Sequence, residues 1–183
     1  MIILGIDPGS ICTGWGVVRR DGPRLRYVAA GTIKAGKDLE LPARLHAIYE
    51  ALRAVITEHA PSSLAVEDIF HAHFAASALK LGHARGVALL VGAQAGLPIS
   101  AYPPALVKRS VAGRGQADKA QVARIVGAIL GLRDLPEVDA TDALAIAITH
   151  AQALLSQRGQ ASVAPRAGAP SGINRRSAPG RPS

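Results

Sequence analysis

The sequence predicts one α/β domain with a mixed five-stranded sheet flanked by helices. Three strand-like runs joined by turn residues occupy the N-terminal part of the chain, and helical and strand-like segments alternate after them. The chain has 183 residues, of which 49% are hydrophobic and 19% are charged, so it can build one well-packed core. The antiparallel-capable strands at the start and the alternation that follows together predict a mixed sheet.

Apolar runs bounded by turn residues mark the strands. The first run has no polar side chain, as expected of a strand that is buried on both faces. Asp21-Gly22-Pro23 supplies the hairpin turn between the second and third strands. The predicted strands are Ile2–Ile6, Gly14–Arg20, Leu25–Ile33, Leu64–Ile69 and Ile99–Tyr102.

Five helices are predicted between and after these strands. In the first, Leu45, Ile48 and Leu52 share one apolar stripe, and Pro42 suits the first helical position. The second is apolar on every face over Val87–Ala93, so it needs cover on two sides, from the sheet and from either a neighbouring helix or a second subunit. The predicted helices are Pro42–His59, 75–96, a short helix ending at Lys108, Asp118–Leu130 and Asp139–Leu155.

The composition changes near the end of the chain. Residues 157–183 are rich in Gly, Ala, Pro, Ser and Arg, and they have too few large apolar side chains to offset the entropy of ordering. We therefore expect a folded domain over 1–156 and a disordered basic tail over 157–183. Of the formal net charge of +8, residues 158–183 carry +5 and the rest of the chain +3. The basic balance favours a polyanionic partner, although an ordinary basic surface has the same charge.

The location of the protein is predicted from what the sequence lacks. Cys12 is the only cysteine, so an internal disulfide is excluded and a reducing compartment is favoured. The first residues run directly into a strand rather than a basic leader and an apolar signal segment. No apolar run approaches the ~20 residues that a membrane helix requires. We expect a cytoplasmic protein without a membrane contact.

Four acidic residues have positions that favour a shared site. Asp7 and Glu67 each end a predicted strand, and sites in open α/β sheets lie just outside such strand ends. Asp139 and Asp142 are three residues apart, which places both on one face at the start of the last helix. Two purely structural interpretations stay open: Asp7 precedes a Pro-Gly turn, and Asp139 can cap its helix.

The acidic pair Glu67-Asp68 needs a further choice. Successive side chains of a strand point to opposite faces, so only one of the two can face the site. We predict that Glu67 points inward and Asp68 outward. An apolar run that ends in two acids is rarely only structural, because a buried unpaired charge is costly.

A cluster of acids in a basic protein predicts a bound cation. Like charges at short range raise one another's pKa, so at least one acid is expected to titrate far above its ordinary range when no metal is present. Mg²⁺ prefers oxygen ligands, and two such ions can hold both the attacking and the leaving oxygen of a phosphodiester. Lys108 and Lys119 lie near the proposed site and can meet the charge of a phosphate. The alternative of a solvated surface lysine stays open for both and is weaker for Lys108 than for Lys119.

Five segments resemble, in order and spacing, the RuvC family of bacterial Holliday-junction resolvases. The resemblance extends over roughly residues 1–155, and its last segment is the most specific. The segments are GIDPGSICTG (5–14), VEDIF (66–70), SALKLGHARG (77–86), GRGQADKAQ (113–121) and DATDALAIAITH (139–150).

The resemblance implies an RNase H-like fold and a homodimer that resolves four-way DNA junctions. It implies paired, symmetric, metal-dependent cuts that leave 5′-phosphate and 3′-hydroxyl ends, with Mg²⁺ as cofactor, two ions in each subunit, and Mn²⁺ as a substitute. It also implies a branch-migration helicase complex as partner, in recombination and repair. The catalytic and metal-binding acids implied are Asp7, Glu67, Asp139 and Asp142. Lys108 and Lys119 are implied as catalytic, and the implied DNA contacts are Phe70, Lys80, Arg85, Lys108 and Lys119.

The chain departs from the family pattern beside Phe70, whose ring is expected to stack on a base. Phe74 stands where an asparagine is common and His83 where a glutamine is common, while His71 and His73 add imidazoles to the same loop. These departures concern the DNA contacts and the preferred cutting sequence, not the acids. The tail arginines are expected to add a weak DNA contact that does not depend on sequence.

Two other functions remain to be distinguished from a nuclease. GIDPGS also resembles the first phosphate loop of sugar kinases and actin, but those proteins need two lobes around ATP and 183 residues supply one. A junction-binding module without catalysis would use its acids only for caps and ion pairs. Such a module would bind metal negligibly and would tolerate Asp7→Asn.

Overall fold

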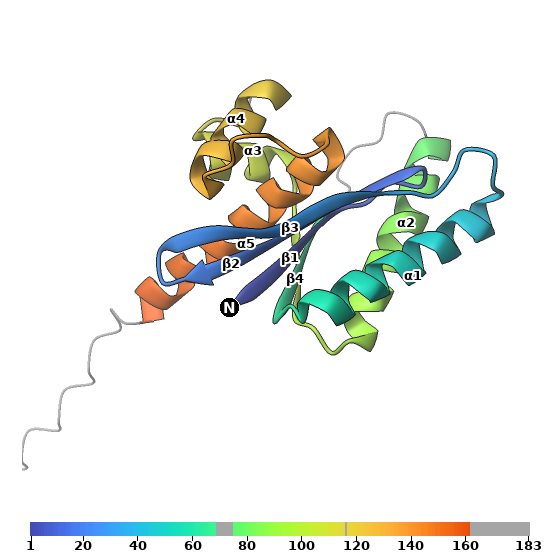
Figure 1. Ribbon diagram of the computed structural model, residues 1–183, viewed down its shortest axis with the longest axis horizontal. Coiled ribbons are helices and arrows are strands. Elements are labelled where there is room, and N and C mark those ends of the chain that lie inside the picture. The colour runs from blue at the N-terminus through green and yellow to red at the C-terminus, as the bar shows by residue number, and fades with distance from the viewer. Residues whose placement is uncertain (69–74, 116, 162–183) are drawn as a thin grey trace, which may run out of the picture.

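The computed structural model describes residues 1–68, 75–115 and 117–161, and along them five strands and five helices follow one another (Figure 1). The strands are β1 (Ile2–Asp7), β2 (Cys12–Asp21), β3 (Arg24–Lys34), β4 (Ser63–Glu67) and β5 (Ile99–Tyr102). The helices are α1 (Leu41–His59), α2 (Ala75–Gln94), α3 (Pro104–Ala112), α4 (Lys119–Leu130) and α5 (Val138–Ala161).

The strands form one mixed sheet in the order β3-β2-β1-β4-β5. β1 and β3 each pair antiparallel with β2, whereas β4 runs parallel to β1 and β5 runs parallel to β4. The central strand β1 is buried on both faces, with Ile3, Leu4 and Ile6 fully inaccessible. The predicted mixed five-stranded sheet is confirmed.

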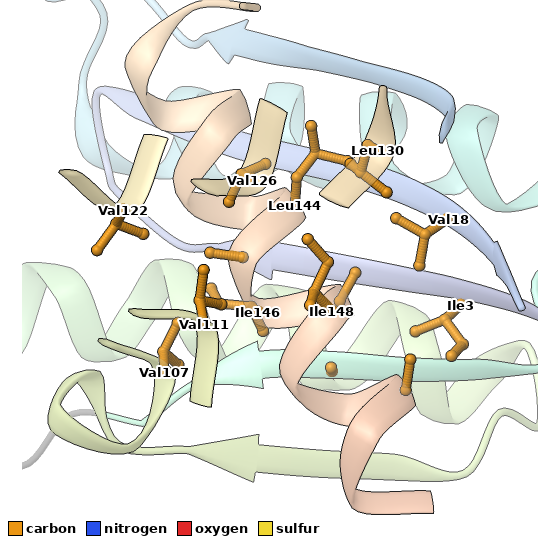
Figure 2. Close-up of a cluster of buried hydrophobic side chains, with 14 of the residues drawn as sticks. Ile3, Val18, Val107, Val111, Val122, Val126, Leu130, Leu144, Ile146 and Ile148 are labelled. Atoms are coloured by element: carbon orange, nitrogen blue, oxygen red, sulfur yellow. The ribbon is translucent and has the colours of Figure 1, made fainter. Parts of the chain in front are cut away.

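Helices cover both faces of the sheet, with α5, α3 and α4 on one face and α1 and α2 on the other (Figure 1). On the first face, Ile3 and Val18 from the strands share a core with Leu144 and Ile148 of α5, behind which the valines of α3 and α4 pack (Figure 2). This packing makes α5 the central helix of the domain, and it is the helix that carries Asp139 and Asp142.

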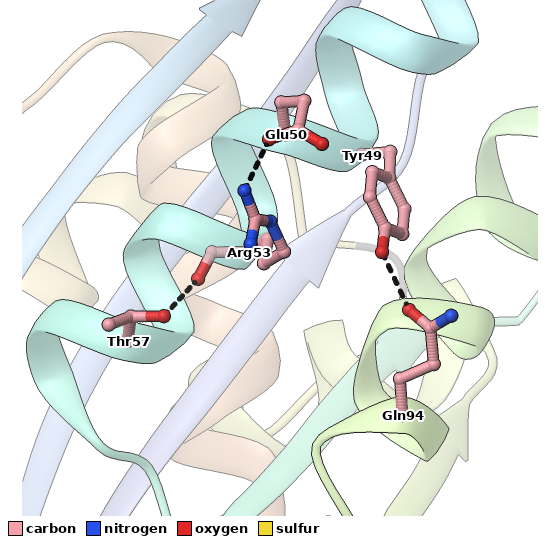
Figure 3. Close-up of polar contacts among 5 residues, drawn as sticks. All are labelled: Tyr49, Glu50, Arg53, Thr57 and Gln94. Carbon is pink, nitrogen blue, oxygen red and sulfur yellow. Dashed lines mark hydrogen bonds and ion pairs between the residues drawn. The ribbon is translucent and has the colours of Figure 1, made fainter.

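On the opposite face α1 and α2 pack side by side, and α2 also contacts β4 and β5. Ile48 and Leu52 of α1 share a core with the other side of β1. The hydroxyl of Tyr49 donates to Gln94 Oε1 at 2.9 Å, which ties α1 to the end of α2 (Figure 3). Helix α1 therefore covers one side of α2, while Leu79 and Leu90 on the outer side of α2 stay exposed.

Two helices extend beyond their predicted ends. Helix α3 runs to Ala112 rather than to Lys108, because Val107 and Val111 are both buried one turn apart and only Gly113, with φ +74°, ends it. Helix α5 runs to Ala161, six residues past the predicted end, so it enters the segment expected to be a disordered tail. Gln157, Arg158, Gln160 and Ala161 have good helix propensity, and it outweighs the lower propensity of Gly159 between them. The rest of that tail, 162–183, lies outside the described residues.

Helix α5 lies unusually close to β1 and β2, and glycines make this possible. A Cβ on Gly5 would overlap the carbonyl oxygen of Ala143, and a Cβ on Gly14 would overlap that of Asp139. Both clashes involve backbone atoms, which cannot rotate away as a flexible side chain can. The first turns of α5 are therefore fixed against the end of β1. No helix in the described residues has the length and apolar character needed to cross a membrane.

We predict that Gly5→Ala lowers the free energy of unfolding by about 1–3 kcal/mol or more, since overpacking forces α5 away from the sheet. The control is Gly115→Ala, where the new methyl meets only the carbonyl oxygen of Ala105 at an ordinary 3.6 Å. That change should be neutral or stabilise by up to ~1 kcal/mol. Urea unfolding of both variants measures the difference, and equal midpoints would contradict the close packing of α5.

Candidate active site

Two carboxylates are brought together by parallel strand pairing. Ile6 on β1 pairs with Val66 on β4, so the next residues, Asp7 and Glu67, end neighbouring strands at the same edge of the sheet. The turn after Asp7 is fixed by Thr13, whose hydroxyl donates to the carbonyl oxygen of Gly9 at 2.7 Å. Asp7 therefore sits on rigid backbone at the carboxyl end of the central strand.

A third carboxylate comes from α5. Asp142 lines the same cavity as Asp7 and Glu67, one turn into the helix that the glycines hold against β1. The start of α5 is fixed by Thr141, whose buried hydroxyl donates to the carbonyl oxygens of Pro136 at 3.2 Å and Glu137 at 3.1 Å. The sequence did not predict this role of Thr141. Its position between Asp139 and Asp142, at the start of the last helix, is the signal that could have indicated it.

The cavity has a volume of about 310 Å³ and mixes acidic, basic and apolar walls. Its acidic wall is made by Asp7, Glu67 and Asp142, and Lys108 and Lys119 complete its charged lining. The apolar wall comes from α3, α4 and α5. The other lining residues are Pro104, Val107, Val122, Ala145 and Ile146.

Burial and mutual repulsion change the protonation of these acids. The pKa of Asp7 is raised to about 8, first by burial and then by the negative charges of Glu67, Asp142 and Asp139. The pKa of Glu67 is also raised, mainly by burial and by Asp142, and a hydrogen bond with Asp7 partly opposes this rise. Near neutral pH, Asp7 thus keeps a proton that it can share with Glu67. The sequence predicted that at least one acid of the cluster has a strongly raised pKa, and in the structure this acid is Asp7.

The two lysines enter the cavity from different helices. Lys119 is the first residue of α4, and its Nζ lies 2.9 Å from Asp142 Oδ2. The start of α4 is set by Asp118, whose carboxylate accepts a hydrogen bond from the backbone N–H of Gln121 at 2.7 Å. Lys108 comes from α3, and its charge opposes the rise in the pKa of Glu67. The structure therefore brings both predicted lysines to the acidic cluster.

Asp139 lies beside this cavity rather than in its lining. Its charge reaches Asp7 and helps to raise the pKa of that carboxyl, and its side chain also bonds the thiol of Cys12. Asp139 occupies the first turn of α5, but its helix begins one residue earlier, at Val138, so Asp139 is not the residue preceding the helix. Four acids thus gather at one end of α5, three of them around the cavity.

The donor set fits a hard divalent cation. Within 1–68, 75–115 and 117–161, no three acidic, His or Cys side chains already close around one point as a finished metal site. Asp142 is paired instead with Lys119. Oxygen donors on rigid strand ends nevertheless match the ligands that Mg²⁺ prefers, and a cation would relieve the repulsion that raises the pKa of Asp7.

The remaining predicted DNA contacts fall into two groups. Phe70, together with the departures at His71, His73 and Phe74, lies outside the described residues. Lys80 and His83 are exposed on α2. Arg85, on the same helix, is only partly exposed and is paired with Asp68. The alternation predicted for the acidic pair holds, since Glu67 faces the cavity and Asp68 faces α2.

His150 is buried in the middle of α5, away from the cavity. Its Nδ1 lies 2.7 Å from the hydroxyl of Tyr102 and its Nε2 lies 3.2 Å from Ser63 Oγ. Burial lowers the pKa of His150, so the ring is kept neutral among neutral partners. It ties the middle of α5 to β4 and β5.

The sheet has this mixed topology, and acids from β1, β4 and α5 share one cavity with two lysines. Together these features define a nuclease with an RNase H-like fold. The family model described as "Crossover junction endodeoxyribonuclease RuvC" matches residues 3–150. A curated RuvC from Sorangium cellulosum is 52% identical over 181 residues, which cover 99% of this chain and 98% of that protein. The chain therefore belongs to the RuvC family of crossover junction endodeoxyribonucleases.

Solved structures agree with this assignment. The structure described as "T. thermophilus RuvC in complex with Holliday junction substrate" has a TM-score of 0.81 and 36% identity, over 86% of this chain and 96% of that one. The yeast mitochondrial Holliday junction resolvase Ydc2 shares the fold at 13% identity, with a TM-score of 0.59 over 86% of this chain and 83% of that one. The chain is a hydrolase of the resolvase class.

The raised pKa of Asp7 predicts a pH-dependent stability of the metal-free protein. Between about pH 4 and pH 8 the folded protein binds this proton and the unfolded chain does not, so stability falls as pH rises through that range. The slope from one such group is at most about 1.4 kcal/mol per pH unit. Asp7→Asn removes this ionisation, so the variant should lose less stability than wild type as pH rises. At pH 8 the variant should therefore be more stable than wild type.

Urea unfolding in EDTA at several pH values measures this dependence for wild type and Asp7→Asn. The exposed acid Asp38 supplies the control, since Asp38→Asn should leave the wild-type profile unchanged. Parallel profiles for wild type and Asp7→Asn would show that Asp7 has an ordinary pKa in the folded protein.

Proposed function

We propose that Asp7, Glu67, Asp139 and Asp142 bind two Mg²⁺ ions and that this centre cuts four-way DNA junctions. The observation that carries the proposal is the convergence of three of these carboxylates and two lysines on one cavity in a member of a resolvase family. When bound, the ions would supply an activated water and stabilise the leaving 3′-oxygen, and Mn²⁺ can substitute for Mg²⁺.

The protein's own residues contribute binding, orientation and charge. The acids hold hard oxygen donors on the rigid ends of β1 and β4 and on the first turns of α5. Asp7 must lose its proton before it can act as a ligand, so its raised pKa makes metal binding stronger as pH rises. Lys119 and Lys108 can approach the scissile phosphate and offset its developing negative charge.

The substrate and products follow from the family and its solved relative. The Thermus relative is described as a complex with a Holliday junction substrate, which supports the same substrate here. A junction is close to two-fold symmetric, so two centres related by a two-fold axis would make paired, symmetric cuts. Each cut would leave a 5′-phosphate and a 3′-hydroxyl. Phe70 is proposed to stack on a base of the opened junction, which contributes ~1–3 kcal/mol per base.

A homodimer through α2 is part of the proposal. Leu79 and Leu90 are 64% and 52% exposed, and helical spacing places them on one face with Gly82, His83 and Gly86. Added Cβ atoms at Gly82 and Gly86 would meet nothing within 4 Å, so the face is open and lined by small residues between two leucines. Such a face allows close approach of a second copy of the helix.

The remaining proposals concern the setting of the reaction. A branch-migration helicase complex is the proposed partner, since the junction must be moved to a preferred sequence before it is cut. A cytoplasmic location is proposed because the substrate is chromosomal DNA. Lys80, exposed on α2, and the arginines of the tail are proposed to add phosphate contacts that weaken with salt.

Asp7→Asn should abolish cutting while it preserves junction binding. The loss in kcat should be at least about 1,000-fold, or ~4 kcal/mol of transition-state stabilisation, because one ligand of the proposed ions is removed. The measurement is nicking of a synthetic four-way junction with Mg²⁺, with linear duplex and EDTA as negative controls. Asp38→Asn is the matched control and should cut as wild type does.

Tight junction binding with no cuts by wild type in either Mg²⁺ or Mn²⁺ would overturn the nuclease proposal and favour a non-catalytic binding module. Full cutting by Asp7→Asn would remove Asp7 from the proposed site. Thermal unfolding with and without Mg²⁺ gives a second readout, since only wild type should be stabilised by the ion.

Leu90→Glu should split the dimer without unfolding the subunit. The side chain is already half exposed, so a charge costs little in the monomer, but two such charges would face each other across the α2 contact. Leu39→Glu, at a position 46% exposed outside α2, is the control. Sedimentation measures the mass of each variant, and an unchanged dimer in Leu90→Glu would place the subunit contact elsewhere.

A further inference from the structure

Arg85 makes two contacts with the end of β4. Its Nε donates to the carbonyl oxygen of Glu67 at 3.2 Å, and its terminal nitrogen lies 3.0 Å from Asp68 Oδ1. The side chains of Arg85 and Asp68 are 23% and 35% exposed, so the ion pair is partly shielded from water. A planar guanidinium donates to a carbonyl and a carboxylate from separate nitrogens in a fixed fork, whereas a lysine donates from a single nitrogen on a flexible stem.

The strand end is held from its other side as well. The backbone N–H of Asp68 donates to the carbonyl oxygen of Tyr102 at 2.9 Å, which continues the pairing of β4 with β5 beyond Glu67. Glu67 therefore stands between a sheet bond on one side and the guanidinium of Arg85 on the other. Residue 68 is also the last described residue before the segment that carries Phe70.

These contacts do not suit a residue that binds DNA phosphate directly. To reach a phosphate, Arg85 would have to leave Asp68 unpaired and the carbonyl oxygen of Glu67 without this donor, each at a cost in partly buried surroundings. Lys80, on the same helix, is exposed and is better placed to meet a phosphate.

We propose that Arg85, through Asp68 and the backbone of Glu67, is a positioning residue for the acidic centre and not a DNA contact. The inference rests on the proposed role of Glu67 as a metal ligand. A displacement of about 1 Å at a reacting group can cost 100-fold in rate, so a guanidinium that fixes the Glu67 backbone acts on chemistry rather than on binding. Because α2 also carries the exposed leucines, the same helix connects the proposed subunit contact to the catalytic acid.

The test compares Arg85→Ala, Arg85→Lys and Asp68→Asn. The matched control is Arg53→Ala, because Arg53 is an arginine of α1 that is also held in an ion pair, with Glu50 at 2.8 Å. Positioning predicts that Arg85→Ala lowers kcat on a synthetic junction by about 10–100-fold, the usual effect of removing a group that orients a metal ligand. It also predicts weaker Mg²⁺-dependent thermal stabilisation of the DNA-free protein. The affinity for junction DNA and the slope of log K against log salt should stay as in wild type.

Arg85→Lys should restore little, because lysine has no fork, and Asp68→Asn should lower kcat in the same direction by less. The double change Arg85→Ala with Asp68→Asn should cost less than the product of the two single effects, since both break one contact. Lys80→Ala, which removes a proposed phosphate contact, should reduce the salt slope by about one. Arg53→Ala breaks an exposed ion pair outside the site, so it should match wild type in kcat, in Mg²⁺ stabilisation and in salt slope.

A salt slope reduced by about one in Arg85→Ala with an unchanged kcat would overturn the proposal and make Arg85 a phosphate contact. Full activity of Arg85→Lys with unchanged Mg²⁺ stabilisation would overturn it too. Glu67→Gln is measured in the same series: if it stays active, the proposed role of Glu67 fails, whereas an inactive Glu67→Gln beside an active Arg85→Ala overturns only the role of Arg85. Should Arg85→Ala not fold, Asp68→Asn and Arg85→Lys decide the question by the same readouts.

Discussion

The close contact between α5 and the glycines of β1 and β2 is the constraint on which the site depends. Gly5 and Gly14 leave no room for a Cβ beside the backbone of α5, so the helix axis lies as near to the sheet as backbone atoms permit. Asp142 is thereby brought from a helix to the end of β1, where Asp7 stands. A larger side chain at either glycine would move one ligand of the proposed centre relative to another.

The second constraint is electrostatic. Carboxylates on rigid elements cannot move apart to relieve their repulsion. The repulsion is reduced in two other ways: Asp7 keeps its proton, and Lys119 pairs with Asp142. Both the protonation and the ion pair are reversible. In the proposed centre a divalent cation would replace the proton and a phosphate would compete for the lysine, so the same charges would favour the binding of metal and DNA.

Much of this arrangement could be predicted because it is local or periodic. β5 has its predicted bounds, and the alternation of Glu67 and Asp68 placed the correct acid at the cavity. The ends of helices were harder to predict. Helix α3 continues past Lys108 because Val111 is buried, and this burial depends on the packing of the whole domain. The expected roles of the acids and the lysines came from the family resemblance and not from periodicity, and they stay predictions.

The contacts of Arg85 could not be read from the sequence at all, because the residue lies seventeen positions after Asp68 and meets it only when α2 packs beside β4. A basic residue in a segment of a DNA-cutting family implies a DNA contact, and only three-dimensional packing shows that the residue has a partner inside the protein.

The difference between a DNA contact and an internal contact matters for function. An arginine that holds the backbone of Glu67 does so whether or not DNA is bound, so the proposed metal ligand would already be in place when a junction binds. Helix α2 would then use two faces. The outer face, with its exposed leucines, suits a second subunit, and on the inner face Arg85 donates to the backbone of Glu67. A shift of α2 caused by subunit association would reach β4 through Arg85 and through the core that Ala84 and Ala88 share with Val66. The proposed subunit contact and the proposed metal ligand Glu67 are therefore mechanically connected.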